Sequence, residues 1–187
     1  MSTVRRYRNA YTDYLRLEKE SPLKLEYSDG EIFAMAGGTP EHGALAMQLV
    51  RMLAAQLPRA CRVFSSDVKV RIPATDLATF PDLSIVCGPL ERASDDANAI
   101  VNPRYLVEVT SPSTEEYDRG DKLSQYKQLS SLEAVLLISH RRRQATVVTR
   151  QGATWTEAEF RAGERAVLSP DLSFDVTELY EVVDGLQ

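Results

Sequence analysis

The sequence predicts an α/β (α+β) fold, a mixed β-sheet of five or more strands flanked by helices on both faces. Three short, continuous apolar runs, residues 83–87, 105–109 and 135–138, are typical of strands that are buried on both faces. A longer segment, residues 39–56, has the wide apolar face of a core helix. Since helices and strands alternate along the chain, we expect them to pack in layers around the sheet.

The N-terminal third is expected to form a short helix, a hairpin and this long helix. Residues 12–18 place apolar side chains at helical spacing. Residues 24–35 read as a hairpin around the Asp-Gly pair at 29–30, which supplies the positive φ that a tight turn needs. Thr39 can cap the long helix and Pro40 suits its first position, so the helix is expected to begin there.

The middle of the chain is expected to add a half-buried strand and a loop. Residues 68–72 alternate apolar and basic side chains, which predicts a strand that keeps Lys69 and Arg71 in water. Residues 88–103 are polar and are expected to form a loop, with the two aspartates at 95–96 exposed.

The C-terminal part is expected to supply a helix and the last strands. Residues 117–129 have a helical pattern, and residues 145–149 and 154–156 are expected to pair as antiparallel strands. Asp175 and Glu178 stand three residues apart, as in a capping box, which predicts a short final helix.

Length and composition are those of one globular domain. The 187 residues are 43% hydrophobic, which suits a single domain over 1–187 with a core spanning about residues 10–180. The net charge of −5 excludes a uniformly basic nucleic-acid coat but is compatible with a local basic groove. No apolar run approaches the roughly 18–20 residues of a membrane span, so no membrane partner is expected.

The two cysteines and the absence of common enzyme motifs argue against several further classes of protein. Cys61 and Cys87 have no ligand-type neighbours that would indicate a zinc site. They are expected to be plain packing residues of a cytoplasmic protein, where disulfides are rare. Motifs of zincins, α/β-hydrolases, P-loop proteins and dinucleotide-binding proteins do not occur in the sequence.

Two carboxylates stand at predicted buried strands. Asp82 directly precedes the run 83–87, and Glu108 lies inside the run 105–109. An ionised carboxylate within an apolar strand costs several kcal/mol unless a cation or hydrogen-bond donors pair with it. If the two strands are neighbours, both acids could meet at one edge of the sheet.

Lys122 is a candidate partner for these acids. It shares a helix stripe with Tyr126 and Leu129, so a helix that packs those two on the sheet would direct Lys122 toward the strand ends. Two carboxylates suit Mg²⁺ or Mn²⁺, and such a metal could activate water for attack on a phosphate. A structural ion pair between Glu108 and Lys122 and a loop-capping role for Asp82 are the alternatives.

Motifs around these residues resemble the Uma family, small bacterial proteins described as restriction endonucleases. The matching motifs are Pro81-Asp82, Glu108-Val109, Ser111-Pro112-Ser113-Thr114, Asp118-Arg119-Gly120-Asp121-Lys122 and Tyr126. Three further matches lie upstream, at Leu25-Glu26-Tyr27, Asp29-Gly30-Glu31-Ile32 and His42. Because that family is similar in fold to the PD-(D/E)XK nucleases, the resemblance implies a restriction-endonuclease-like mixed sheet flanked by helices, with an N-terminal hairpin.

The resemblance implies a metal site and a catalytic lysine. Asp82 and Glu108 would hold Mg²⁺ or Mn²⁺, with Glu26 as a third carboxylate and the backbone carbonyl of Val109 as a further ligand. The wider superfamily has a lysine two residues after the second acid, which is Thr110 here. The Uma pattern places the lysine on the following helix instead, so the resemblance implies a catalytic role for Lys122.

DNA is the substrate that the resemblance implies, and four residues are candidates to contact it. His42 could lie near the site or simply cap its helix. Ser111 could contact a phosphate, although a turn role is the alternative. Arg141 and Arg142 belong to a basic turn that could grip the phosphate backbone or could be solvated.

Two functions from different classes follow. The first is a Mg²⁺-dependent endodeoxyribonuclease, which the resemblance implies leaves 5′-phosphate and 3′-hydroxyl ends, and for which a homodimer would suit cleavage of both strands. The second is a catalytically inactive nuclease fold that serves as a binding or assembly module. Thr110 at the usual lysine position and the acidic net charge favour the second.

Overall fold

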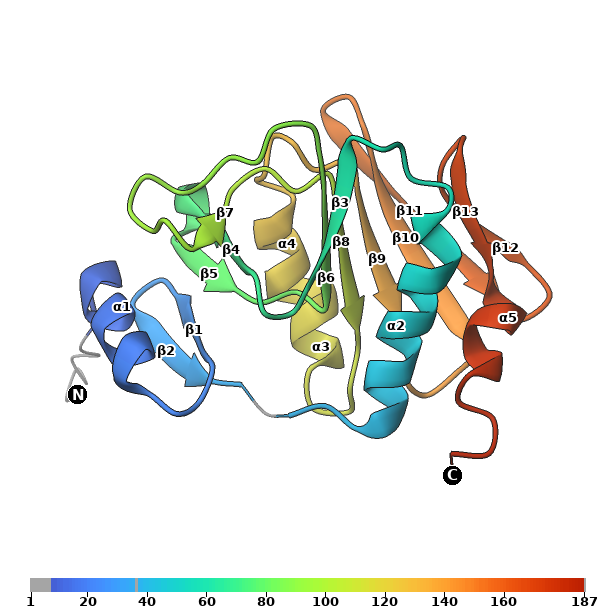
Figure 1. Cartoon of the computed structure of the whole chain (residues 1–187), viewed down its shortest axis with the longest axis horizontal. Coiled ribbons are helices and arrows are strands. Elements are labelled where there is room, and N and C mark those ends of the chain that lie inside the picture. Colours follow the sequence, from blue (N-terminus) through green and yellow to red (C-terminus); the bar gives the residue numbers. More distant parts are fainter. Residues whose placement is uncertain (1–7, 36, 187) are drawn as a thin grey trace, which may run out of the picture.

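Two β-sheets, joined by segments of chain that run from one to the other, organise the molecule (Figure 1). The structure is a computed structural model that describes residues 8–35 and 37–186. Its helices are α1 (Tyr11–Glu20), α2 (Pro40–Ala54), α3 (Glu115–Tyr117), α4 (Leu123–Tyr126) and α5 (Val176–Glu181). Its strands are β1 (Leu25–Ser28), β2 (Glu31–Ala34), β3 (Cys61–Ser65), β4 (Lys69–Ile72), β5 (Leu77–Thr79), β6 (Leu83–Cys87), β7 (Ala99–Ile100), β8 (Tyr105–Val109), β9 (Ala134–Ile138), β10 (Gln144–Gln151), β11 (Thr154–Arg161), β12 (Arg165–Ser169) and β13 (Leu172–Asp175). None of the described helices combines the length and the apolar composition that crossing a membrane would require.

The larger sheet has six strands in the order β11-β10-β9-β8-β6-β3, and the smaller has five in the order β2-β1-β5-β4-β7. β12 and β13 form a separate pair. In the larger sheet β8 and β9 are parallel and the other neighbours are antiparallel, so the predicted mixed α+β fold is confirmed. The chain leaves the larger sheet after β3 and returns after β5, and Asp82 lies in that return, immediately before β6.

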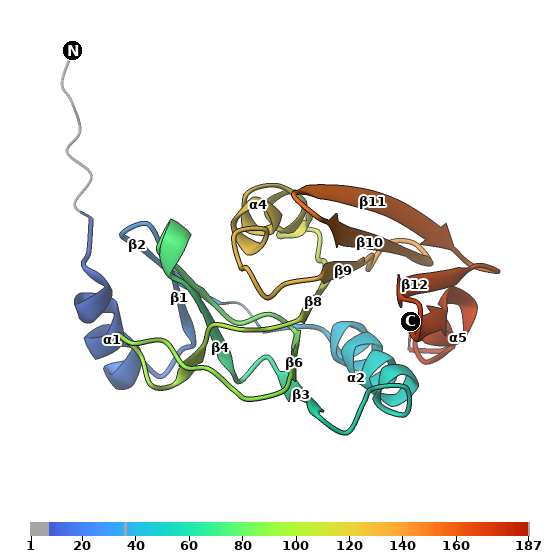
Figure 2. The same ribbon diagram turned by 90° about the horizontal axis from the view of Figure 1, so that it is seen from above.

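Helices cover both faces of the larger sheet, with α2 on one side and α4 on the other (Figure 2). Strand side chains alternate between these two layers. Leu49 of α2 shares one apolar core with Val107, whereas Tyr126 of α4 shares the other with Leu106. Glu108 is two residues after Leu106, so its side chain points toward the helix that carries Tyr126.

Local turn and capping signals position the first elements as predicted. Asp29 and Gly30 both have positive φ, +46° and +87°, and they join β1 to β2. Thr39 caps α2 by accepting a hydrogen bond from the backbone N–H of His42 at 3.3 Å. Asp175 caps α5 in the same way, as the capping-box spacing predicts.

The prediction that the strand at 68–72 keeps one face in water is wrong. All four residues of β4 are buried, and Lys69 and Arg71 are only 3% and 4% exposed. Lys69 Nζ lies 2.5 Å from Glu18 of α1 and 2.7 Å from Asp96, so Asp96 is buried as well, against expectation. These partners come from distant parts of the chain, and for that reason the alternation along one strand could not reveal them.

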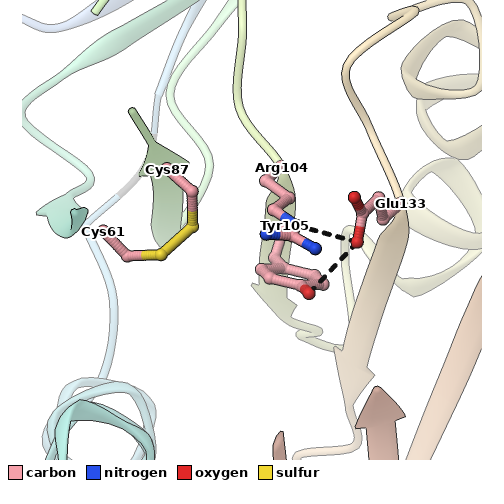
Figure 3. The surroundings of a disulfide bond; sticks show 5 residues. All are labelled: Cys61, Cys87, Arg104, Tyr105 and Glu133. Atoms are coloured by element: carbon pink, nitrogen blue, oxygen red, sulfur yellow. Dashed lines mark hydrogen bonds and ion pairs between the residues drawn. A yellow bond between two sulfur atoms is a disulfide. The ribbon is translucent and has the colours of Figure 1, made fainter. Parts of the chain in front are cut away.

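Cys61 of β3 and Cys87 of β6 form a disulfide bond (Figure 3). The two residues face each other across antiparallel strands, with Cα atoms 3.9 Å apart. The expectation of two unlinked packing cysteines is therefore wrong, because the pairing of β3 with β6 brings together residues 26 positions apart. The bond also removes cysteine usage as an argument for the cytosol. On the neighbouring strand, Arg104 and Tyr105 both contact Glu133, at 2.8 and 3.2 Å (Figure 3).

Several short strands carry too little pattern to be predicted. β3, β5, β7, β12 and β13 have only two to five residues each, so neither an apolar run nor an alternation extends far enough in them to predict a strand. β7 is two residues long and lies inside the segment expected to be a loop. β11 continues to Arg161, beyond the predicted 154–156, because it pairs with β10 along its whole length.

Candidate active site

A buried glutamate, lysine and tyrosine form the centre of the site. Glu108 of β8 is 4% exposed, and its Oε1 lies 3.0 Å from Nζ of Lys122, which is 5% exposed. The hydroxyl of Tyr126 donates a hydrogen bond to the same oxygen. The helix stripe predicted from sequence thus directs Lys122 onto Glu108, while Tyr126 and Leu129 pack in the core.

Lys122 ends a π-helical segment, Asp118–Lys122, that joins α3 to α4. π-Helical turns inside α-helices occur frequently at functional sites. Asp118 is also buried, and its Oδ1 lies 3.5 Å from Nζ of Lys122. We did not predict Asp118 as a site residue, because an acid four residues before a lysine usually marks an exposed pair on a helix.

Asp82 and His42 form the second part of the site. Asp82 Oδ2 accepts a hydrogen bond of 2.7 Å from the backbone N–H of Val109 and lies 3.2 Å from Nε2 of His42. His42 reaches Asp82 from the first turn of α2, which Thr39 caps. The hydrogen bond with Asp82 raises the pKa of His42, although partial burial opposes this.

Glu26 of β1 joins the site through the smaller sheet. It accepts hydrogen bonds from the Thr79 hydroxyl and, at 2.9 Å, from the backbone N–H of Phe80. These donors lie just before Asp82, because β5 pairs with β1 and then leads into β6. The hairpin glutamate is therefore fixed to the same return segment that carries Asp82.

Negative charge exceeds positive charge in the described part of this site. The pKa of Glu108 is raised to about 8. Burial is the main cause, the positive charge of Lys122 opposes it, and the negative charges of Asp82 and Asp118 add to it. Burial alone would lower the pKa of Lys122, but Glu108, Glu26 and Asp118 raise it instead. Lys122 therefore stays protonated, and a further cation would be stabilised beside these carboxylates.

Comparison with known proteins identifies the family. Residues 11–179 match the Uma2 family, which is described as a putative restriction endonuclease. The chain belongs to this family. Two uncharacterized proteins of Synechocystis sp. are related: one is 35% identical over 90% of this chain and 89% of its own length, and the other is 28% identical over 67% and 72%.

The fold of this Uma2 chain also matches a solved structure. A crystal structure described as a putative nuclease belonging to DUF820 from Anabaena variabilis aligns with a TM-score of 0.72. The alignment covers 92% of this chain and 97% of that chain, at 16% sequence identity. The likeness shows a shared fold, so the predicted family and the nuclease-like fold are both confirmed.

The other predicted site residues of this Uma2 chain lie at the margin of the carboxylate cluster. Ser111 bonds to the hydroxyls of Ser113 and Thr114, each at 3.0 Å, which is the turn role. Arg141 and Arg142 are exposed in the turn between β9 and β10, and Arg141 lies 3.6 Å from a glutamate of α3. Within the described residues, no hydrogen bond or ion pair joins these side chains to Asp82 or Glu108.

The residues that could hold a metal can be assessed from their free oxygens. Among residues 8–35 and 37–186, no group of three or more His, Cys, Asp or Glu side chains is arranged as a metal site. Asp82 and Glu108 nevertheless each direct one oxygen, Oδ2 and Oε1, to their closest protein partners. Within residues 8–35 and 37–186, no hydrogen bond or ion pair is seen to the other oxygen of either carboxylate, and hard cations prefer carboxylate oxygens as ligands.

Proposed function

We propose that this Uma2 protein is a metal-dependent endonuclease that hydrolyses phosphodiester bonds in DNA. The observation that carries the proposal is the buried pair of Glu108 and Lys122 beside Asp82, at the edge where the return segment enters the larger sheet. Family membership and the nuclease-like fold support DNA as the substrate. We further propose that the active form is a homodimer, since a two-fold pair offers one site to each strand.

The proposed metal is Mg²⁺ or Mn²⁺. Asp82 and Glu108 would hold it, Glu26 would be a third carboxylate, and the backbone carbonyl of Val109 would be a further ligand. Hard divalent cations favour such oxygen ligands, and the excess of carboxylates around a single lysine supports a cation here. When bound, the ion would activate water and neutralise charge on the phosphate.

The protein groups have separate roles in this proposal. Lys122 keeps its proton and places a positive charge where the attacked phosphate becomes more negative. Tyr126 fixes the orientation of Glu108 through its hydrogen bond, and His42 does the same for Asp82. In the wider superfamily a lysine at the position of Thr110 would supply this charge from the strand. Here Lys122 supplies it from the following helix.

Four residues are proposed to contact DNA. His42 lies in the site, and Ser111 follows the strand that carries Glu108. Thr110 contacts the His140 ring at 3.4 Å, which places the β9–β10 turn beside the end of β8. Arg141 and Arg142 belong to that turn, so their charges lie on the side of the molecule where a phosphate backbone would approach.

Nicking of supercoiled plasmid tests the proposal. The wild-type protein is expected to nick DNA with Mg²⁺ or Mn²⁺ and to be inactive in EDTA. Glu108→Gln and Lys122→Met should abolish nicking, while Glu181→Gln, a change at an exposed glutamate of α5, should leave it intact. Absence of nicking by the wild-type protein with either metal, together with absence of Mn²⁺ binding, would favour the inactive binding module.

A further inference from the structure

A groove of about 350 Å³ lies between the N-terminal hairpin and the helix that carries Lys122. Two exposed aromatic rings line it, Phe33 of β2 and Tyr117 of α3, with 47% and 36% of their surface accessible. The other lining side chains are polar or acidic: Ser28, Glu31, Asp121, Ser124 and Gln125. Ligand pockets in proteins begin at about 300 Å³, so the groove can accept a small planar group.

The hairpin wall of the groove is continuous with the candidate active site. Phe33 and Glu26 are direct cross-strand partners, and Ser28 pairs with Glu31 in the same way. Residues paired across a hairpin project from the same face. Phe33 therefore shares a face of the hairpin with Glu26, the residue that is bonded to the return segment before Asp82.

The helical wall of the groove carries residues that are sequence neighbours of the site residues. Tyr117 and Asp121 line the groove, and each directly precedes a buried site residue, Asp118 and Lys122. One stripe of the helix thus faces Glu108, and the adjacent stripe faces the groove. The pKa of Tyr117 agrees with this arrangement, because burial raises it and Glu26 raises it further.

The charges, hydrogen-bonding groups and rings that line the groove indicate which ligand it can bind. None of the described side chains that line it is a lysine or an arginine, and the acid Asp121 would repel a phosphate. A carboxylate such as that of Asp121 accepts hydrogen bonds from amino and ring N–H groups, and the Gln125 amide can both donate and accept. Aromatic rings on a nucleic-acid-binding surface stack with bases of any sequence. The combination matches the flat face and polar edge of a nucleobase.

We propose that this groove binds one nucleobase of the substrate against Phe33 and Tyr117, next to the phosphate that is cleaved. The proposal rests on the nuclease function proposed above and adds a substrate class to it. A paired base is stacked inside the duplex and cannot enter such a groove. The preferred substrate is therefore DNA with an unpaired nucleotide at the cleavage point, as in a single strand, a gap, a flap or a duplex site that supercoiling has opened.

Binding of short oligonucleotides in EDTA tests the base site without requiring cleavage. The probes are a fluorescent 20-nucleotide single strand and the matching duplex. Phe33→Ala and Tyr117→Ala should each weaken binding of the single strand about 10-fold or more, with a much smaller effect on the duplex. Tyr117→Phe keeps the ring and should bind as wild type does. Val167→Ala, at an exposed position of β12, is the matched control.

A spectroscopic signal separates stacking from a general loss of affinity. 2-Aminopurine in the single strand is quenched when it stacks on an aromatic ring, and this quenching should disappear in Phe33→Leu, which keeps an apolar side chain but no ring. Equal binding and quenching in wild type, Phe33→Leu and Tyr117→Ala would overturn the base site, even if plasmid nicking succeeds. Ring-dependent binding without cleavage of either plasmid or single strand in Mg²⁺ or Mn²⁺ would support the base site and refute the nuclease function.

Discussion

Two buried lysines of this protein lie among carboxylates, and their surroundings differ in one respect. Lys69 contacts Glu18 and Asp96 beneath α1, and a second cation, Arg71, lies on the same strand. We call these residues, with Asp76 and Asp95, the N-terminal ion cluster. Lys122 contacts Glu108 and Asp118 without a second lysine or arginine among the described contacts of those two acids.

The acids respond in opposite directions in the two regions. Burial alone would raise the pKa of Asp96, but hydrogen bonds from Lys69 and from the Asn98 backbone lower it. Burial raises the pKa of Glu108 to about 8, and Lys122 does not compensate for it. In the N-terminal ion cluster, Lys69 thus holds the one buried acid, Asp96, in its charged form, and the other acids are partly exposed to water. In the candidate active site one lysine lies between two buried acids, Glu108 and Asp118, and this shortage of positive charge is compatible with the metal proposed above.

Removing the carboxylate at the site should produce the largest effect. We expect Glu108→Gln to lower the nicking rate by at least about 100-fold, since it removes charge that acts on the reacting groups. The same change should have little effect on the free energy of unfolding, because burial already raises the pKa of Glu108 to about 8 and Asp118 still contacts Lys122. Plasmid nicking and urea unfolding measure the two effects. A stable variant with full activity would contradict the proposed role.

Removing each lysine should separate the two regions by stability. Lys69→Met leaves Asp96 and Glu18 without their cation, and we expect a loss of about 3–5 kcal/mol in the free energy of unfolding. Lys122→Met should cost less, because burial already raises the pKa of Glu108 to about 8 and the protonated acid needs no cation beside it. Urea unfolding at neutral pH compares the variants. Equal losses would mean that Lys122 is as structural as Lys69.

Adding metal should stabilise one region and leave the other unaffected. Mn²⁺ at 100 times its dissociation constant should raise the free energy of unfolding by about 2.7 kcal/mol through mass action. Lys69→Met should keep this gain, whereas Glu108→Gln should lose it. Thermal unfolding with and without Mn²⁺ measures the difference. A gain that survives Glu108→Gln would place the metal elsewhere.

The smallest effect should be a pH dependence in the N-terminal ion cluster. Because the folded-state pKa of Asp96 lies below its ordinary value of 3.8, its charge stabilises the fold above that pH. The contribution is lost as the pH falls through the lowered pKa. Asp96→Asn should therefore cost about 1–2 kcal/mol near pH 6 and progressively less as the pH falls below 3.8. Urea unfolding across this pH range measures the change in the free energy of unfolding. If burial raised the pKa of Asp96 instead, Asp96→Asn would stabilise the protein near pH 6.

The same contrast explains what the sequence could predict. Glu108 stands out because an acid interrupts an apolar strand, and Lys122 stands out because it continues a stripe of core residues. Both signals lie within a few residues of chain, and the structure brings the two side chains together. The capping and turn residues, such as Thr39 and the Asp29-Gly30 pair, are local for the same reason.

Features built from distant segments could not be predicted. Lys69 and Arg71 alternate with apolar residues as solvent-facing side chains do, and only the docking of α1 over them makes the face a buried one. Cys61 and Cys87 depend on a pairing between two strands, one of which carries no recognisable pattern. Asp118 looks like an ordinary surface partner of Lys122 until the π-helical segment turns both side chains into the core.

The π-helical segment has a consequence for where a substrate would be cut. It carries the groove residue Asp121 and the site residue Lys122 on adjacent positions, so in the proposed complex one turn of backbone would set the offset between the bound base and the hydrolysed bond. Such a turn would fix a distance and would not recognise a base sequence. It would give breaks at a constant distance from an unpaired nucleotide while remaining indifferent to which base that nucleotide carries.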